Sequence, residues 1–163
     1  MEKLTIKHCS IMWRNFEGRK TEYKPEGYRT FHVKLDEETA VQLAEEGWSI
    51  THRPGNEKYP EDSYSMKVVV SYEKFAPTIW MITGDRKIPL MEETVRQLDY
   101  ADLEDISLVV SPSVWKSGTR TGVTAYLNTL YAVVKEDELA SEYAWAHEAE
   151  PSFPGEDEET MPF

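Results

Sequence analysis

The sequence predicts a mainly β protein with short helices between its strands. About six segments of strand length alternate apolar, β-branched or aromatic residues with polar ones, which is the period of a strand with one buried face. Glycine and proline lie between these segments and indicate turns. A body of about 135 residues is long enough to bury a core without disulfides or metal. The pattern allows a small closed β-barrel, a β-sandwich or an α+β sheet.

The N-terminal half supplies the first strands and one helix. Strands are expected at residues 3–16, 30–35 and 48–51. Asp36 and the two glutamates after it are typical of a helix N-terminus, so we expect a short helix from Asp36 through Ala44, with Gly47 at its end. Loops that contain glycine and proline are expected at residues 17–27 and 53–63.

The C-terminal half continues the same alternation. Strands are expected at residues 66–72, 78–83, 106–110 and 121–134, with one or two helical turns at 91–98. Pro112 is expected to break the third of these strands, and Ser117-Gly118 to form a hairpin turn before the last. Asp137 can cap a C-terminal helix that extends to His147.

Acidic residues are concentrated at the C-terminal end of the chain. The net charge is −12, but residues 1–135 carry all 18 lysines and arginines against 20 acids, and residues 136–163 carry the other 10 acids and no base. Residues 1–35 are locally basic, with 8 basic and 4 acidic side chains. Because a local basic patch attracts phosphates whatever the total charge, the body can be a nucleic-acid binder.

The chain ends in a short acidic segment with an apolar tip. No lysine or arginine occurs after Lys135, so nothing nearby in the sequence neutralises these acids. The segment cannot bury enough apolar surface to fold alone, which favours a linear motif presented to a partner. A tail that only improves solubility is the alternative. The predicted partner-binding residues are Glu156, Asp157, Glu158, Glu159, Met161, Pro162 and Phe163.

This acidic ending with a final Pro-Phe resembles the tip of bacterial and phage single-stranded DNA-binding proteins. Stretches of the body are similar to a family of bacteriophage proteins of this kind, at residues 12–19, 28–35, 45–48, 114–122 and 125–127. The resemblance implies an oligonucleotide-binding (OB) barrel that coats single-stranded DNA. It also implies that the tail recruits replication or recombination proteins and competes with DNA for the basic groove.

Aromatic and basic residues are most densely mixed between residues 13 and 31. Single strands are bound without sequence preference by rings that stack on bases and cations that contact phosphates. On a strand, Trp13 and Arg14 point to opposite faces, and burial in the core is the alternative for Trp13 and Phe31. The predicted DNA-binding residues here are Trp13, Arg14, Phe16, Arg19, Lys20, Tyr23, Arg29 and Phe31.

A second cluster surrounds the predicted hairpin turn. An exposed tryptophan next to cations is hard to explain by packing, and such a hairpin can fold over a single strand like a finger. A tryptophan that closes one end of the barrel is the alternative. The predicted DNA-binding residues here are Trp115, Lys116, Arg120 and Tyr126. Trp48 and Trp80 are expected in the core.

The sequence gives little support to an enzyme. The four histidines are dispersed, Cys9 is the single cysteine, and no Cys-x-x-Cys, His-Glu-x-x-His or glycine-rich phosphate loop occurs. The carboxylates between residues 99 and 105 follow a predicted helix and are expected to be solvated or capping, so neither a metal nor a cofactor is predicted. The single cysteine and the lack of an apolar leader predict a cytoplasmic protein, in the bacterial host if phage-encoded, with no membrane association.

The predicted organisation is an OB-like single-stranded DNA-binding domain at residues 1–135, a helix at 136–150 and a flexible acidic tail at 151–163. The expected function is to bind and coat single-stranded DNA during phage replication or recombination. The alternative is an acidic adaptor or DNA mimic that acts on a host enzyme, which the net charge of −12 favours and the cations before residue 35 oppose. A nuclease is a weaker alternative, and assembly into a homo-oligomer is left open.

Overall fold

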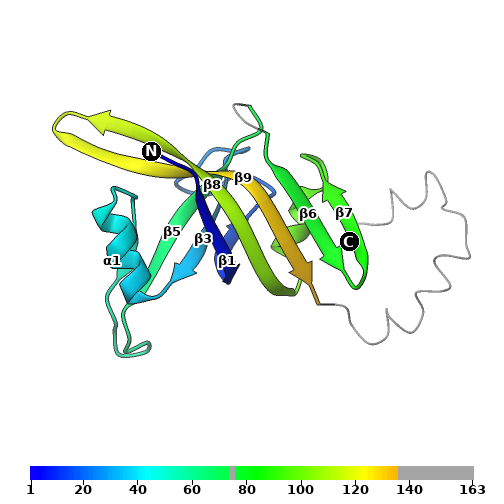
Figure 1. Cartoon of the computed structure of the whole chain (residues 1–163), viewed down its shortest axis with the longest axis horizontal. Helices are drawn as coiled ribbons and strands as arrows, with labels where there is room; N and C mark the ends of the chain where they lie inside the picture. The colour runs from blue at the N-terminus through cyan, green and yellow to red at the C-terminus, as the bar shows by residue number, and fades with distance from the viewer. Residues whose placement is uncertain (74–75, 136–163) are drawn as a thin grey trace, which may run out of the picture.

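The computed structural model describes residues 1–73 and 76–135. Within them the chain forms nine strands, one α-helix and one 3-10 helix (Figure 1). The helices are α1 (Glu37–Glu45) and η1 (Val95–Asp99). The strands are β1 (Leu4–Cys9), β2 (Ile11–Asn15), β3 (Arg29–Leu35), β4 (Thr51–Arg53), β5 (Ser63–Val70), β6 (Thr78–Thr83), β7 (Arg86–Leu90), β8 (Leu103–Ser117) and β9 (Arg120–Val134). The predicted C-terminal helix and acidic tail lie outside the described residues.

The sheet curls into a barrel. The strands β1, β8, β9, β5, β3 and β2 are neighbours in that order. Since β1 and β2 are separated only by Ser10, the first and last members of this order are two parts of one broken strand. The Ser10 carbonyl accepts a hydrogen bond from the Lys34 amide at 2.9 Å. Barrel pairs are antiparallel except β5 with β9. This five-stranded connectivity is that of an OB barrel, which confirms the predicted fold.

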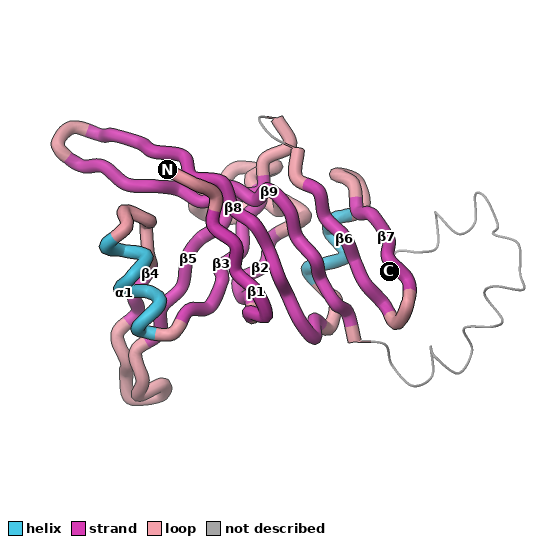
Figure 2. Tube along the Cα trace, in the orientation of Figure 1, coloured by secondary structure: helices cyan, strands magenta, loops and turns pink. Residues whose placement is uncertain are grey.

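Two additions extend the barrel. β6 pairs in parallel with the second half of β9 and antiparallel with β7, so these two strands lengthen the sheet beyond the barrel. α1 lies in the connection between β3 and β4, on the opposite side of the barrel from β6 and β7 (Figure 2). On the same side as α1, the paired ends of β8 and β9 project from the barrel as a long hairpin (Figure 1).

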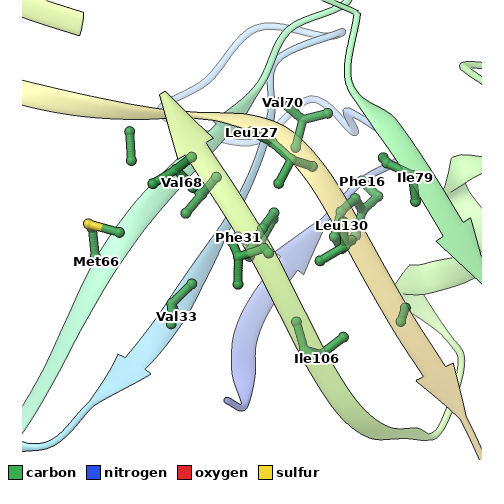
Figure 3. Packing of buried hydrophobic residues seen from close by; sticks show 14 of the residues in the cluster. Phe16, Phe31, Val33, Met66, Val68, Val70, Ile79, Ile106, Leu127 and Leu130 are labelled. Carbon is green, nitrogen blue, oxygen red and sulfur yellow. The ribbon is translucent and has the colours of Figure 1, made fainter. Parts of the chain in front are cut away.

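The barrel interior is apolar. Side chains alternate along a strand, so every second residue of the barrel strands points inward. Figure 3 shows Phe31 and Val33 of β3, Val68 of β5 and Leu127 of β9 directed toward a common centre. Trp48 is 4% exposed, as predicted, whereas Trp80 is only partly buried. The largest fully buried side chains include Phe16, Phe31, Met66, Ile79, Leu98, Ile106, Leu108, Leu127 and Leu130.

α1 forms where the sequence predicts it. The Asp36 carboxylate accepts a hydrogen bond from the Thr39 amide at 2.7 Å, which satisfies one of the amides that lack a partner at a helix start. After the helix, Gly47 has a φ of 105°, in the left-handed region that glycine adopts without strain.

The predicted strand at residues 3–16 is divided into β1 and β2. His8 and Trp13 have φ of 52° and 50°, and the pairing register shifts near each of them. Such bulges bend a strand, and the bend allows β1 to pair with β8 and β2 with β3. The prediction of one continuous strand is wrong because a left-handed residue that is not glycine leaves no signal in the sequence.

β8 and β7 also differ from the prediction. β8 continues through Pro112, which was expected to end it. β1 pairs with β8 only as far as Val110, so among the described strands β8 has β9 as its one neighbour at Pro112. Proline is tolerated at such an edge, because the position facing solvent needs no amide donor. Residues 86–90 form β7 although their lysine and proline are weak strand formers, because they pair with β6.

Candidate nucleic-acid interface

One sheet face outside the barrel carries polar, basic and aromatic side chains. Its residues alternate with the core positions of β3, β5 and β9 and therefore point away from the interior. Strand pairing places His32 opposite Lys67, and Val69 between Thr30 and Tyr126. We call this face of the sheet the outer face, and it consists of Thr30, His32, Lys34, Ser65, Lys67, Val69, Thr124 and Tyr126. Ser65 and Val69 are buried within it, at 2% and 6% exposure.

Trp13 lies at one border of the outer face. Its ring contacts His32 edge to face, with 4.7 Å between the ring centroids. The Arg53 guanidinium lies 5.0 Å from the centroid of the Trp13 ring, a cation–π distance. The Trp13 side chain is 46% exposed. An accessible aromatic surface and a cation are therefore held together outside the barrel.

A groove of about 880 Å³ adjoins Trp13. One wall comes from β2 and β3, and the other from β4, the start of β5 and the connection between them. Tyr59 in this connection is 64% exposed, and the Lys58 ammonium lies 5.5 Å from the centroid of its ring. The aromatic and basic residues that line the groove are Trp13, Lys34, Arg53, Tyr59 and Tyr64.

Asp62 holds the connection that borders the groove. Its carboxylate accepts hydrogen bonds from the Gly55 amide at 2.7 Å and from Nε2 of His52 at 2.9 Å. These two bonds, chiefly the first, hold the pKa of Asp62 below its ordinary value. The His52 ring stacks on Tyr64 with 4.7 Å between centroids and 7° between planes. The Asp62 carboxylate is thus engaged in hydrogen bonds within the connection between β4 and β5. The stacked His52 ring supports the orientation of Tyr64 at the groove.

Positive charge on the outer face comes from lysine and arginine rather than histidine. Burial, and then the charge of Lys67, lower the pKa of His32 to about 4. His32 is therefore neutral at pH 7, with its Nδ1 2.9 Å from Ser65 Oγ. Lys34 and Arg53 are exposed and Lys67 is partly exposed, so these three side chains supply the cations at the groove and the outer face.

Two predicted stacking residues lie in the core instead. Phe16 and Phe31 are both 0% exposed, and their rings stack on each other with 5.0 Å between centroids. Phe31 belongs to the inward-pointing residues of β3, and Phe16 follows the bulge of β2 into the interior. The prediction that these two rings stack on DNA bases is wrong, because no base can reach them.

Two predicted phosphate-binding arginines hold the backbone together. Arg14 Nη1 donates to the carbonyls of Leu98 and Ala101 at 2.7 and 2.8 Å, at the end of η1. Arg29 Nε donates to the Phe16 carbonyl at 2.8 Å, and the Arg29 side chain is only 15% exposed. Both arginines therefore have a structural role, and phosphate contacts by them stay a prediction.

The loop at residues 16–28 presents the remaining predicted residues of the first cluster. Tyr23 is 83% exposed and Lys20 is also exposed. The Arg19 side chain is 43% exposed, although its Nη2 donates to a backbone carbonyl of β2. Gly27 N donates to the Gly18 carbonyl at 2.7 Å and closes the loop. A DNA-binding role for Arg19, Lys20 and Tyr23 stays a prediction.

The β8–β9 hairpin places its predicted residues on two sides. Trp115 pairs with Gly122, and a Cβ added at Gly122 would lie 2.6 Å from Cζ2 of Trp115, so the indole lies across the glycine. Strand alternation puts Trp115, Arg120 and Tyr126 on the side that continues the outer face, and Lys116 on the other. DNA binding by these four residues stays a prediction.

The sequence pattern did not point to the groove residues that complete the site. Arg53, Tyr59 and Tyr64 belong to or border a segment expected as a polar loop, and Lys34 and Lys67 to expected strands. A usable signal was present, because Arg53 and the Lys58-Tyr59 pair repeat the mixture of cations and rings found at residues 13–31. Arg53 and Tyr59 are brought into the same groove as Trp13 only by the fold.

Other kinds of site find no support in the described part of the chain. Residues 1–73 and 76–135 contain no group of three or more His, Cys, Asp or Glu side chains placed to hold a metal ion. No helix in these ranges is long and apolar enough to cross a membrane. Burial raises the pKa of the Cys9 thiol to about 11, so it stays protonated and unreactive near neutral pH.

Three solved structures that are similar to this one are of a single phage protein. The single-stranded DNA-binding protein from bacteriophage Enc34, as a C-terminal truncation, matches with a TM-score of 0.54 and 10% identity over 83% of this chain and 87% of that chain. The same protein in complex with ssDNA gives 0.54 and 10% over 83% and 88%. A third Enc34 structure gives 0.52 and 11% over 90% of each chain. At this identity the likeness concerns the fold, and it agrees with the OB barrel.

Family membership rests on a separate comparison. No curated protein sequence matches the chain. The family described as "Putative phage ssDNA-binding domain" matches residues 1–160, which is nearly the whole sequence. The chain therefore belongs to this phage ssDNA-binding domain family.

Proposed function

We propose that this protein binds and coats single-stranded DNA without strong sequence preference, during phage DNA replication or recombination in the bacterial cytoplasm. The observation that carries the proposal is the Arg53–Trp13 pair beside the groove at the outer face. OB barrels bind oligonucleotides on the face of their second and third strands, and β3 and β5 are those strands here. Membership of the family and the Enc34 complex with ssDNA support it further.

The groove supplies both parts of non-specific binding. The exposed rings of Trp13 and Tyr59 can stack on bases, and each stacked base contributes roughly 1–3 kcal/mol. Arg53 and Lys34 can contact phosphates and release the counterions condensed on the strand. Because every base has an aromatic face and every nucleotide a phosphate, neither interaction selects a sequence.

Titration of the full-length chain with a fluorescent oligo-thymidine strand tests the proposal. Anisotropy reports binding, tryptophan fluorescence reports stacking, and a duplex of equal length is the control. We expect the single strand to bind and quench, and log K to fall linearly with log salt, by about 0.7 per neutralised phosphate. The duplex should bind more weakly because its bases are already stacked. No binding of the single strand at low salt would contradict the proposal and favour the acidic adaptor.

We propose further that the acidic C-terminal segment competes with DNA for the basic groove and recruits replication or recombination proteins. Residues 136–163 carry 10 acids and no base, which supports an attraction to the cations of the body. Deleting residues 156–163 is therefore expected to tighten oligo-thymidine binding several-fold at low salt, and less at high salt. A variant with Met161, Pro162 and Phe163 replaced by serine keeps the acids and should bind like the parent. Equal affinities of the parent and the deletion at low salt would refute the competition.

A further inference from the structure

We propose that single-stranded DNA also stacks on a second site, formed by Trp80 of β6, Lys87 of β7 and Tyr131 of β9. We call these three residues the β6–β9 platform. It lies where β6 and β7 extend the sheet along the second half of β9, and none of its residues lines the groove at Trp13. This inference rests on the proposed function, since it extends the path of the bound single-stranded DNA from the outer face to the platform.

The platform combines two rings and one cation. Trp80 is directly opposite Tyr131 in the parallel pairing of β6 with β9. The Lys87 ammonium lies 4.2 Å from the Trp80 centroid and 5.5 Å from the Tyr131 centroid, so one cation is within cation–π distance of both rings. Tyr131 is 39% exposed, whereas its neighbours Leu130 and Ala132 are 0% exposed. The tyrosine therefore faces outward and is open to a stacking partner.

The platform continues the outer face along β9. β8 pairs with β9 along its whole length, so β5 and β6 share the other edge of β9. β5 places Val69 beside Tyr126, and β6 places Trp80 beside Tyr131. A register shift lies between these tyrosines, and for this reason both point outward despite their odd spacing. Along a strand they are about 16 Å apart, a short step for a DNA strand that leaves the outer face.

The charge of this region favours nucleic acid as the occupant. The β6–β7 hairpin carries Arg86 and Lys87 against one acid, Asp85. An apolar protein surface that covered the platform would bury the Lys87 ammonium without a counter-charge, which is costly. A phosphate would pair with that ammonium, and the bases would cover the rings. Cations beside exposed rings are the combination by which single strands are bound without sequence preference.

Oligo-thymidine of two lengths tests the platform. We would measure binding of roughly 6-mer and roughly 20-mer strands to full-length Tyr131→Ala and Lys87→Glu. The first length is near the lower end of the footprint of one OB barrel, about 4–16 nucleotides, and the second exceeds it. We expect each variant to bind the short strand like the parent and the long strand roughly tenfold more weakly. Tyr131→Phe keeps the ring and should behave like the parent. Arg96→Glu makes the same charge change at an exposed residue of η1 and should leave the long-to-short affinity ratio unchanged.

A crosslink provides a direct reading. A long strand with 5-iodouracil at one end should crosslink to Tyr131 on irradiation, as mass spectrometry of the peptides would show. Long-strand affinities of Tyr131→Ala and Lys87→Glu equal to the parent's would overturn the platform while short-strand binding upholds the proposed function. Failure of the parent to bind even the short strand would overturn the proposed function, and the platform with it.

Discussion

The double substitution Trp13→Ala with Arg53→Glu is expected to weaken oligo-thymidine binding at least about a hundredfold. It removes a stacking ring, worth roughly 1–3 kcal/mol, and replaces a phosphate-binding cation with a repelling carboxylate. A hundredfold loss corresponds to about 2.7 kcal/mol. Anisotropy at several salt concentrations measures both effects, because the slope of log K against log salt should fall by about 0.7 for the lost phosphate contact.

Two controls separate this loss from damage to the fold. Trp13→Phe retains a ring beside Arg53 and should keep most of the affinity. Arg96→Glu changes the net charge as much as Arg53→Glu does, at a residue of η1 that does not line the groove, and should cost far less. All variants should melt near the parent temperature, since Trp13 and Arg53 are exposed. Retained affinity in the double variant would mean that the groove is not the binding site.

Asp99→Ala is expected to destabilise the fold by about 3 kcal/mol. The Asp99 side chain is 1% exposed and accepts hydrogen bonds from the Phe16 and Glu17 amides at 2.7 and 3.0 Å. Its removal leaves these amides without their acceptor at the end of β2, and bonds to a charged group contribute about 1.5–3 kcal/mol each. Thermal unfolding by circular dichroism should show a midpoint lower by about 10 °C.

Asp102→Ala is the matched control for that measurement. Asp102 is an exposed acid three positions further on, and the bond that it accepts from the Lys135 amide uses its backbone carbonyl, which alanine keeps. Its effect should be within about 0.5 kcal/mol. An unchanged midpoint for Asp99→Ala would show that water replaces the carboxylate at no cost, and that other contacts, among them the Arg29 bond to the Phe16 carbonyl, suffice to hold the end of β2.

Local signals explain which parts of the fold the sequence predicted. Asp36 caps its own helix, and buried and partly buried residues alternate in the middle of β9, so these elements are set by residues close in sequence. The left-handed His8 and Trp13 are imposed by pairing with distant strands and leave no local mark. Pro112 and β7 were misjudged for the same reason, because only tertiary pairing decides whether a strand runs through them.

The sequence predicts the candidate site as a region rather than as a set of side chains. Mixed rings and cations drew attention to residues 13–31, but their density alone cannot distinguish a cation facing solvent from one bonded to carbonyls, as Arg14 is. Alternation likewise does not show which face of a strand points into the barrel, and Phe31 lies on the buried face of β3. Arg53 and Tyr59 reach the groove only through the fold of β4 and β5.

The barrel closes at Ser10, between β1 and β2, and this affects the order in which its strands can pair during synthesis. Cys9 of β1 pairs with Ile106 of β8, 97 positions later, whereas β2 pairs with β3 nearby in the sequence. At about 5–20 residues per second, a ribosome needs several seconds to add the missing partner. During that interval the first strand has an unsatisfied edge, and pairing over such separations is slow. Closure is thus a late event of synthesis, and a nascent chain that stops before β8 is expected to remain open.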